Sequence, residues 1–278
     1  MDVPRQRLPR RHFLSAAAGL WTVPALLGLA AEGVRATEAP SSPPVSPAFP
    51  GQDAELVREM VGVSHGNAAR VRELLGISPA LAGAAWDWGF GDWETALGAA
   101  SHMGNREIAT LLMENGARPD MFTFAMLGQL DVVKAYVGAR PGIQKTRGPH
   151  GLTLLHHARK GGEAAREVVA YLEQLGDADV AYPNVTQTDA EKAGCVGDYA
   201  FGPGAGDRLS VSLTKEGALA VKRAPDGSNR ILFHLGGGEF HPPGNPAVRL
   251  RFAMADGRAT ALTVTEGARV VTASRVVG

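Results

Sequence analysis

Apolar side chains recur at helical spacing in four segments between residues 53 and 179, and a glycine precedes each segment. After Gly66, Gly104, Gly128 and Gly161 the apolar residues fall at positions i, i+3 and i+4. This spacing places them on one face of a helix. A glycine directly before such a helix suits the tight turn between two antiparallel helices. The pattern predicts short helix pairs that bury their apolar faces against one another.

Beyond Asp179 the apolar positions change to the alternating spacing of β-strands. Runs of this kind lie at 209–213, 219–221, 231–233, 248–252, 261–264 and 270–272. Glu216-Gly217 and Asp256-Gly257 lie at breaks between the runs and are typical of hairpin turns. The pattern predicts about six to eight antiparallel strands over residues 195–278, which form a small barrel or sandwich.

Three segments within the helical region resemble a known repeat. Residues 95–100 are Thr-Ala-Leu-Gly-Ala-Ala, residues 153–158 are Thr-Leu-Leu-His-His-Ala, and residues 114–117 are Glu-Asn-Gly-Ala. They resemble the Thr-Pro-Leu-His-x-Ala signature and the repeat end of the ankyrin-repeat family. The resemblance implies an ankyrin-type α-solenoid over 53–179 that presents a concave surface to a partner. The alternative is a stack that only supports the C-terminal region.

A second resemblance covers the strand region. The region contains, in this order, Gly197-Asp198-Tyr199, Phe240, the run 249–252 and Asp256-Gly257-Arg258. This order is similar to that of the lipocalin-like domain found C-terminal to some penicillin-binding-protein-type serine hydrolases. That domain is an accessory, so the resemblance implies binding or scaffolding; the alternative is a cap on the helical stack. The predicted fold class is α+β in two domains, an ankyrin-type α-solenoid followed by a small antiparallel β barrel or sandwich.

The first 36 residues have the features of an export signal. A basic stretch precedes an uncharged run rich in Ala and Gly, and Val34-Arg35-Ala36 offers small residues at the positions that a signal peptidase reads, so cleavage is expected after Ala36. The stretch resembles the twin-arginine signal at Arg10, Arg11, Phe13 and Leu14. Residues 1–36 are therefore predicted to be a signal peptide and 37–52 a Pro/Ser-rich linker. The mature bacterial protein is expected in the periplasm or outside the cell, touching the membrane only transiently during export; the alternative is a retained N-terminal anchor.

The charge and the cysteine content argue against nucleic acid as a partner and against an intramolecular disulfide. The chain has 28 basic and 28 acidic residues, so its formal net charge is zero. Nucleic-acid binding requires clustered Lys and Arg, and nucleic acid is therefore not an expected partner. Cys195 is the only cysteine, so no intramolecular disulfide forms and the fold is held by packing.

An aromatic loop between the first two predicted helix pairs is the candidate binding site. Three of the four tryptophans lie within eight residues there, together with glycines and carboxylates. Flat rings flanked by carboxylates suit stacking against sugars, cations or peptide side chains. The alternative is that the rings fill the gap left by a long insertion. The predicted binding residues are Trp86, Asp87, Trp88, Phe90, Asp92 and Trp93.

The spacing of the histidines does not indicate catalysis or metal binding. The histidines of the helical region lack the His-Glu-x-x-His pattern that places two ligands on one helix face. The adjacent Ser64-His65 pair does not form a nucleophile and base, because neighbours on a helix point in different directions. The expectation is no enzyme activity, no metal and no cofactor.

These inferences combine into one predicted function. The chain is expected to be an exported, non-catalytic binding or scaffold protein that engages a protein or cell-envelope partner through its repeats. Two alternatives remain open: a small-ligand carrier that uses the β domain, and an envelope hydrolase or its regulatory subunit.

Overall fold

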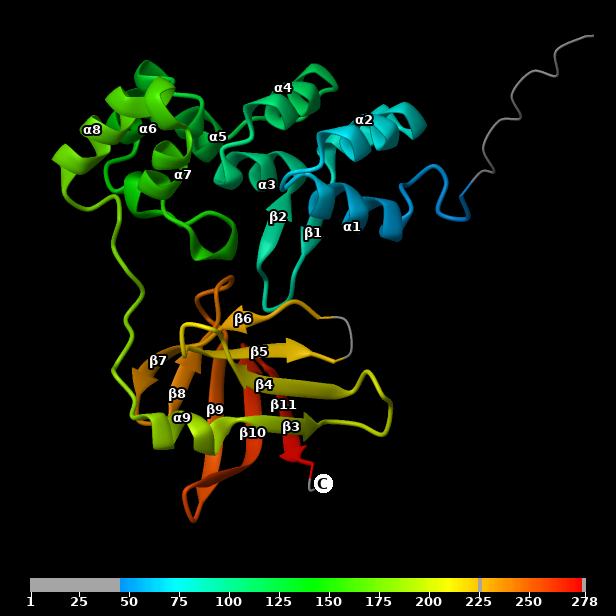
Figure 1. The fold of residues 1–278 in the computed structure, drawn as a ribbon, viewed down its shortest axis with the longest axis vertical. Coiled ribbons are helices and arrows are strands. Elements are labelled where there is room, and N and C mark those ends of the chain that lie inside the picture. Colours follow the sequence, from blue (N-terminus) through cyan, green and yellow to red (C-terminus); the bar gives the residue numbers. More distant parts are fainter. Residues whose placement is uncertain (1–45, 225–226, 277–278) are drawn as a thin grey trace, which may run out of the picture. The chain divides into compact units, whose positions relative to one another are not determined.

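A computed structural model describes residues 46–224 and 227–276, and these residues belong to a single compact unit. Figure 1 shows helices in the first part of this chain and strands in the second. The predicted signal peptide with its Arg10-Arg11 motif, and most of the predicted linker, lie outside the described residues. The described helices are α1 (Ala54–Val63), α2 (Ala68–Ile77), α3 (Ala96–Met103), α4 (Arg106–Glu114), α5 (Met121–Met126), α6 (Leu130–Ala139), α7 (Leu154–Lys160), α8 (Arg166–Leu175) and α9 (Asp189–Cys195).

The helices begin where the sequence offers side-chain oxygens to their free backbone amides. Asp53 accepts hydrogen bonds from the amides of Glu55 and Leu56 at the start of α1. Thr95 accepts from the amide of Gly98 at the start of α3, and the same type of cap starts α2, α4, α5 and α7. Such caps stabilise a helix by about 0.5–2 kcal/mol each. They fix where each helix starts.

A two-stranded hairpin separates the first helix pair from the second. Strand β1 (Ala85–Asp87) pairs antiparallel with β2 (Trp93–Thr95), with Trp86 opposite Glu94. Strand β2 runs directly into α3, because Thr95 is both its last residue and the cap of that helix. The hairpin therefore holds Glu94 at a fixed position beside α1 and α3.

The C-terminal strands form one nine-stranded antiparallel sheet in the order β6-β5-β4-β3-β11-β10-β9-β8-β7. The two edge strands β6 and β7 are separated along the chain by Leu232 alone, so the sheet nearly closes on itself like a barrel. Its interior is filled by fully buried side chains, among them Tyr199, Phe240, Leu250 and Leu262. The strands are β3 (Gly197–Ala200), β4 (Arg208–Leu213), β5 (Leu219–Arg223), β6 (Arg230–Ile231), β7 (Phe233–Gly236), β8 (Glu239–His241), β9 (Arg249–Ala255), β10 (Arg258–Glu266) and β11 (Arg269–Arg275).

The prediction of an ankyrin-type α-solenoid is wrong for the part of the chain that the structure describes. A solenoid repeats one unit around a continuous core. Here the connections between helix pairs differ: the 3-10 helix at Pro79–Gly83 and the β1–β2 hairpin precede α3, whereas two 3-10 helices at Ile143–Lys145 and Pro149–Gly151 precede α7. The chain instead combines these helices with a nearly closed nine-stranded sheet.

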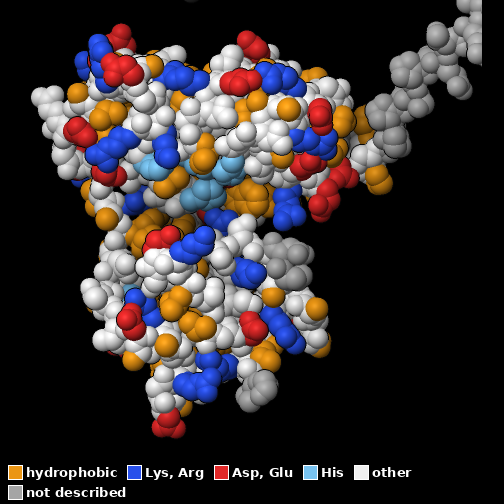
Figure 2. Space-filling view, viewed as in Figure 1, with side chains coloured by type: hydrophobic (Ala, Val, Ile, Leu, Met, Phe, Trp, Pro, Cys, Tyr) orange, Lys and Arg blue, Asp and Glu red, His pale blue; other side chains and the backbone are white. Residues whose placement is uncertain are grey.

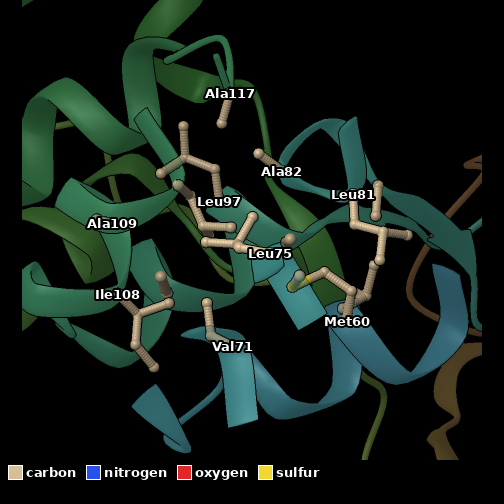
Figure 3. Packing of buried hydrophobic residues seen from close by; sticks show 14 of the residues in the cluster. Met60, Val71, Leu75, Leu81, Ala82, Leu97, Ile108, Ala109 and Ala117 are labelled. Carbon is tan, nitrogen blue, oxygen red and sulfur yellow. The ribbon is translucent and has the colours of Figure 1, made fainter. Parts of the chain in front are cut away.

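The buried apolar side chains of the helical region also divide into two clusters. One is centred on α1–α4 and includes Met60, Leu75 and Ile108; Figure 3 shows its packing. The other is centred on α5–α8 and includes Leu154 and Leu172. A divided core fits irregular helix pairs better than a repeating stack. None of the helices in the described ranges has the length and apolar character needed to cross a bilayer.

Candidate metal centre

Four side chains from separate segments converge beside the β1–β2 hairpin. One ligand atom from each of His65, Glu94, His102 and His150 lies within 4.8 Å of the others. Figure 2 shows histidine side chains gathered on the face of the molecule in view. Three imidazole nitrogens and a carboxylate oxygen form a donor set that divalent transition metals prefer.

Local structure positions each of these residues. His65 lies in the turn that follows α1, Glu94 is the middle residue of β2, and His102 lies in the last turn of α3. His150 is in a 3-10 turn with φ 59° and ψ 16°. A left-handed backbone is unfavourable for a residue other than glycine, and such strain is concentrated at functional sites. The turn keeps His150 in this conformation and directs its ring toward Glu94.

Glu94 is the centre of the cluster. Its carboxylate is fully buried, with Oε1 3.0 Å from His102 Nδ1 and 3.3 Å from His150 Nε2. Its Oε2 lies 3.5 Å from His65 Nε2 and accepts a 2.7 Å hydrogen bond from Trp88 Nε1. Ligands around a tetrahedral ion with bonds of about 2.0–2.1 Å are themselves roughly 3.3 Å apart. The spacing of these side chains therefore suits one bound ion after small movements.

Two buried atoms of the cluster lack a satisfactory hydrogen bond. Glu94 Oε1 and His102 Nδ1 are only 3.0 Å apart, yet neither atom makes a hydrogen bond. Buried polar atoms in folded proteins nearly always have a partner. An ion placed between these two atoms would satisfy both of them.

Hydrogen bonds outside the cluster leave the correct ring nitrogens free. His65 Nδ1 donates to the Gly62 carbonyl over 3.0 Å, and His150 Nδ1 donates to Asp92 Oδ2 over 2.8 Å. Each ring therefore directs Nε2 toward Glu94, and that nitrogen offers a lone pair once it is unprotonated. Asp92 also accepts from the backbone amide of His150 over 2.8 Å. A carboxylate behind a ligating histidine fixes the ring orientation and strengthens its bond to a metal.

The charges in the cluster stabilise each other. Burial raises the pKa of Glu94, but the neighbouring His102, His150 and His65 outweigh it and lower that pKa to about 2. Burial also opposes protonation of His150, but Asp92 and Glu94 outweigh it and raise its pKa to about 9. Without an ion, the positive charge of His150 therefore compensates the buried carboxylates at neutral pH.

A cavity of about 370 Å³ gives access to one side of the cluster. It is lined by His65, Trp88, His150, Ser228, Asn229, Arg230, Ile231 and Pro243. The side chains of His65 and His150 are 31% and 24% exposed, whereas those of His102 and Glu94 are 6% and 0% exposed. The cluster thus has a closed inner side and an outer side that small molecules can reach.

The residues predicted from the aromatic loop are divided between three environments. Trp86 and Trp88 are half-buried against the core of α1–α4, and Trp88 also lines the cavity beside His65. Asp92 is buried and contacts His150. Asp87, Phe90 and Trp93 line a second cavity of about 460 Å³ together with strand residues such as Phe201 and Arg223. The structure therefore does not bring the six predicted residues together into one surface.

Sequence patterns did not indicate a functional role for His65, Glu94, His102 or His150. They come from a turn, a strand, a helix end and a 3-10 turn, so their spacing along the chain carries no motif. The only local signal was the concentration of tryptophans and carboxylates around Trp88 and Asp92.

Comparisons with known proteins do not identify the chain. No family model matches it, and no curated protein matches it. A solved structure, a crystal structure of SurE, is 24% identical over 43% of this chain and 28% of its own length, with a TM-score of 0.25. The aligned region thus spans less than a third of that protein, and a likeness of this size carries no argument. Function is therefore inferred from the geometry of the four-residue cluster itself.

Proposed function

We propose that this protein binds one divalent transition-metal ion through His65, Glu94, His102 and His150, and that the ion is the centre of its function. The observation that carries the proposal is the convergence of four ligand atoms within 4.8 Å, three from histidines and one from the fully buried carboxylate of Glu94. The proposal departs from the expectation of no metal and no cofactor. The predicted binding of a protein or cell-envelope partner stays a prediction beside it.

The donor chemistry favours zinc among the common ions. Imidazole nitrogens suit Zn²⁺, Cu²⁺, Ni²⁺ and Fe²⁺, whereas Mg²⁺ and Ca²⁺ prefer sites made only of oxygen. Three histidines and one carboxylate match the tetrahedral nitrogen and oxygen coordination of Zn²⁺. Because His65 and His150 border the cavity, a further ligand from solution can approach the ion.

Metal content measured by mass spectrometry tests the proposal. The protein is treated with a chelator, reloaded with Zn²⁺ and desalted, and we expect about one ion per chain. His102→Ala and Glu94→Gln each remove a buried ligand and should reduce the bound zinc at least tenfold. His234→Ala is the matched control, because His234 lies on β7 outside the cluster. Equal zinc retention in all variants would contradict the proposal.

A further inference from the structure

The cavity beside the cluster holds an arginine whose hydrogen-bonding capacity is only partly used. Arg230 comes from β6, and its side chain is only 8% exposed. Its Nη1 donates to Asp92 Oδ2 over 2.6 Å and lies 3.0 Å from His150 Nδ1, but its buried Nε has no hydrogen-bond partner. An unpaired buried N–H of a charged group is costly. Arg230 therefore retains a donor that pairing with Asp92 does not satisfy.

Neighbouring contacts keep the guanidinium of Arg230 at the cavity. The same Asp92 Oδ2 accepts from both Arg230 and His150, so one carboxylate orients the arginine and a proposed metal ligand. The centre of the guanidinium lies 5.9 Å from the Trp88 ring. Arg230, Trp88, His65 and His150 all line the cavity of about 370 Å³. The arginine and the proposed ion would therefore face one space.

The charges favour an anion in this space once the ion is bound. A divalent ion and Arg230 contribute three positive charges, and Glu94 and Asp92 contribute two negative charges. With neutral histidines, the site has a net charge of +1. Guanidinium groups bind carboxylates and phosphates through paired hydrogen bonds, and a metal with an accessible position accepts an anionic oxygen.

We infer that the cavity binds an oxyanion, a carboxylate or phosphate group, held between the metal ion and the guanidinium of Arg230. This inference rests on the proposed metal site and names the class of ligand that the site takes. The ligand group places one oxygen on the ion and another on Arg230. Trp88 forms the adjoining wall for the remainder of the ligand.

The visible spectrum of the Co²⁺-loaded protein tests the inference, because it changes when a ligand joins the metal. Inorganic phosphate and acetate are titrated separately as the two probes, and the tighter one shows which oxyanion the cavity prefers. We expect saturable spectral changes in the wild type. Arg230→Gln should retain the Co²⁺ spectrum but bind the preferred anion at least tenfold more weakly. Arg230→Lys, which keeps the charge without the planar fork, should lie in between.

Arg223→Gln is the control, because Arg223 is an exposed arginine on β5 that lines the second cavity instead. It should bind the anion like the wild type. Failure of the wild type to bind Co²⁺ would overturn the proposed function and this inference together. Normal Co²⁺ binding without any effect of either anion would overturn this inference alone, as would equal anion affinity in Arg230→Gln and the wild type.

Discussion

His150 determines how the proposed site depends on pH. A metal binds only the unprotonated imidazole nitrogen, and the pKa of His150 in the metal-free protein is raised to about 9 because Asp92 and Glu94 outweigh the effect of burial. At pH 7.5 this ring is therefore protonated before the ion arrives. Metal affinity should rise with pH up to about 9, and metal binding below that pH should release a proton.

Isothermal titration in two buffers of different ionisation enthalpy measures this release. We expect about one proton or more per zinc ion at pH 7.5. Asp92→Asn should release fewer protons, because the substitution removes the negative charge that helps raise the pKa of His150. Identical heats in both buffers for the wild type would show that His150 is not displaced from its protonated form.

The residues of the site were only partly predictable from the sequence. Trp88 and Asp92 stood out because aromatic residues and carboxylates are concentrated there. Trp88 contacts the proposed ligand Glu94, and Asp92 contacts the proposed ligand His150. The histidines did not stand out, because their ligand role depends on contacts between segments far apart along the chain. Spacing reveals a metal site only when two or more ligands share one local element.

At the scale of elements, the helices were easier to predict than the hairpin. Helices α2, α4, α6 and α8 follow the glycines selected from the sequence, because the i, i+3, i+4 pattern is local. Strands β1 and β2 have only three residues each, too few for an alternating pattern to be distinctive. The hairpin was therefore predicted as a loop, although it carries Glu94.

Contact between the hairpin tip and the strand region gives a test of what holds Glu94 in place. Gly244 lies between β8 and β9 with φ 114°, and a Cβ there would lie 2.7 Å from the Phe90 carbonyl oxygen and 2.8 Å from the Asp92 amide. Gly244→Ala would force this backbone apart, so we expect a loss of about 1–3 kcal/mol of stability. We also expect at least tenfold weaker zinc binding, because Asp92 and Glu94 move with the hairpin.

Gly217→Ala is the matched control for Gly244→Ala. Gly217 also has a positive φ, 76°, but no heavy atom lies within 4 Å of the position of an added Cβ. It should reduce stability through backbone strain alone and leave zinc binding unchanged. Chemical denaturation and zinc competition titrations measure the two effects. Equal zinc affinities in the two variants would show that the hairpin tip does not position the cluster.

At the scale of the whole molecule, the sequence predicted helices followed by strands. It did not predict how the helix pairs are connected or how the sheet nearly closes. The irregular connections and the two separate helical cores replace the expected solenoid. The predicted strand 231–233 is divided at Leu232 into the ends of β6 and β7, the two edges of the sheet. The sheet nearly closes because the chain passes from one edge strand to the other at Leu232. The alternating apolar pattern of residues 231–233 does not reveal this break between strands.

The proposed function also depends on both parts of the chain. The proposed metal ligands come from the turns, helix and hairpin of the first part, whereas Arg230 comes from β6. The buried contact between Asp92 and Arg230 joins them. Asn245 adds a second link, because its amide donates to the Phe90 carbonyl over 3.0 Å. Sequence patterns within either part alone do not indicate such a composite site.

X-ray absorption at the zinc edge is the decisive measurement for the proposed metal site, because it reports the atoms bound to the ion. We expect four or five nitrogen and oxygen neighbours at about 2.0–2.1 Å, with the outer-shell scattering of about three imidazoles. Cys195 is buried in the core of the sheet, so no sulfur neighbour is expected. A sulfur atom at about 2.3 Å, or a spectrum without imidazole scattering, would contradict a metal site built from His65, Glu94, His102 and His150.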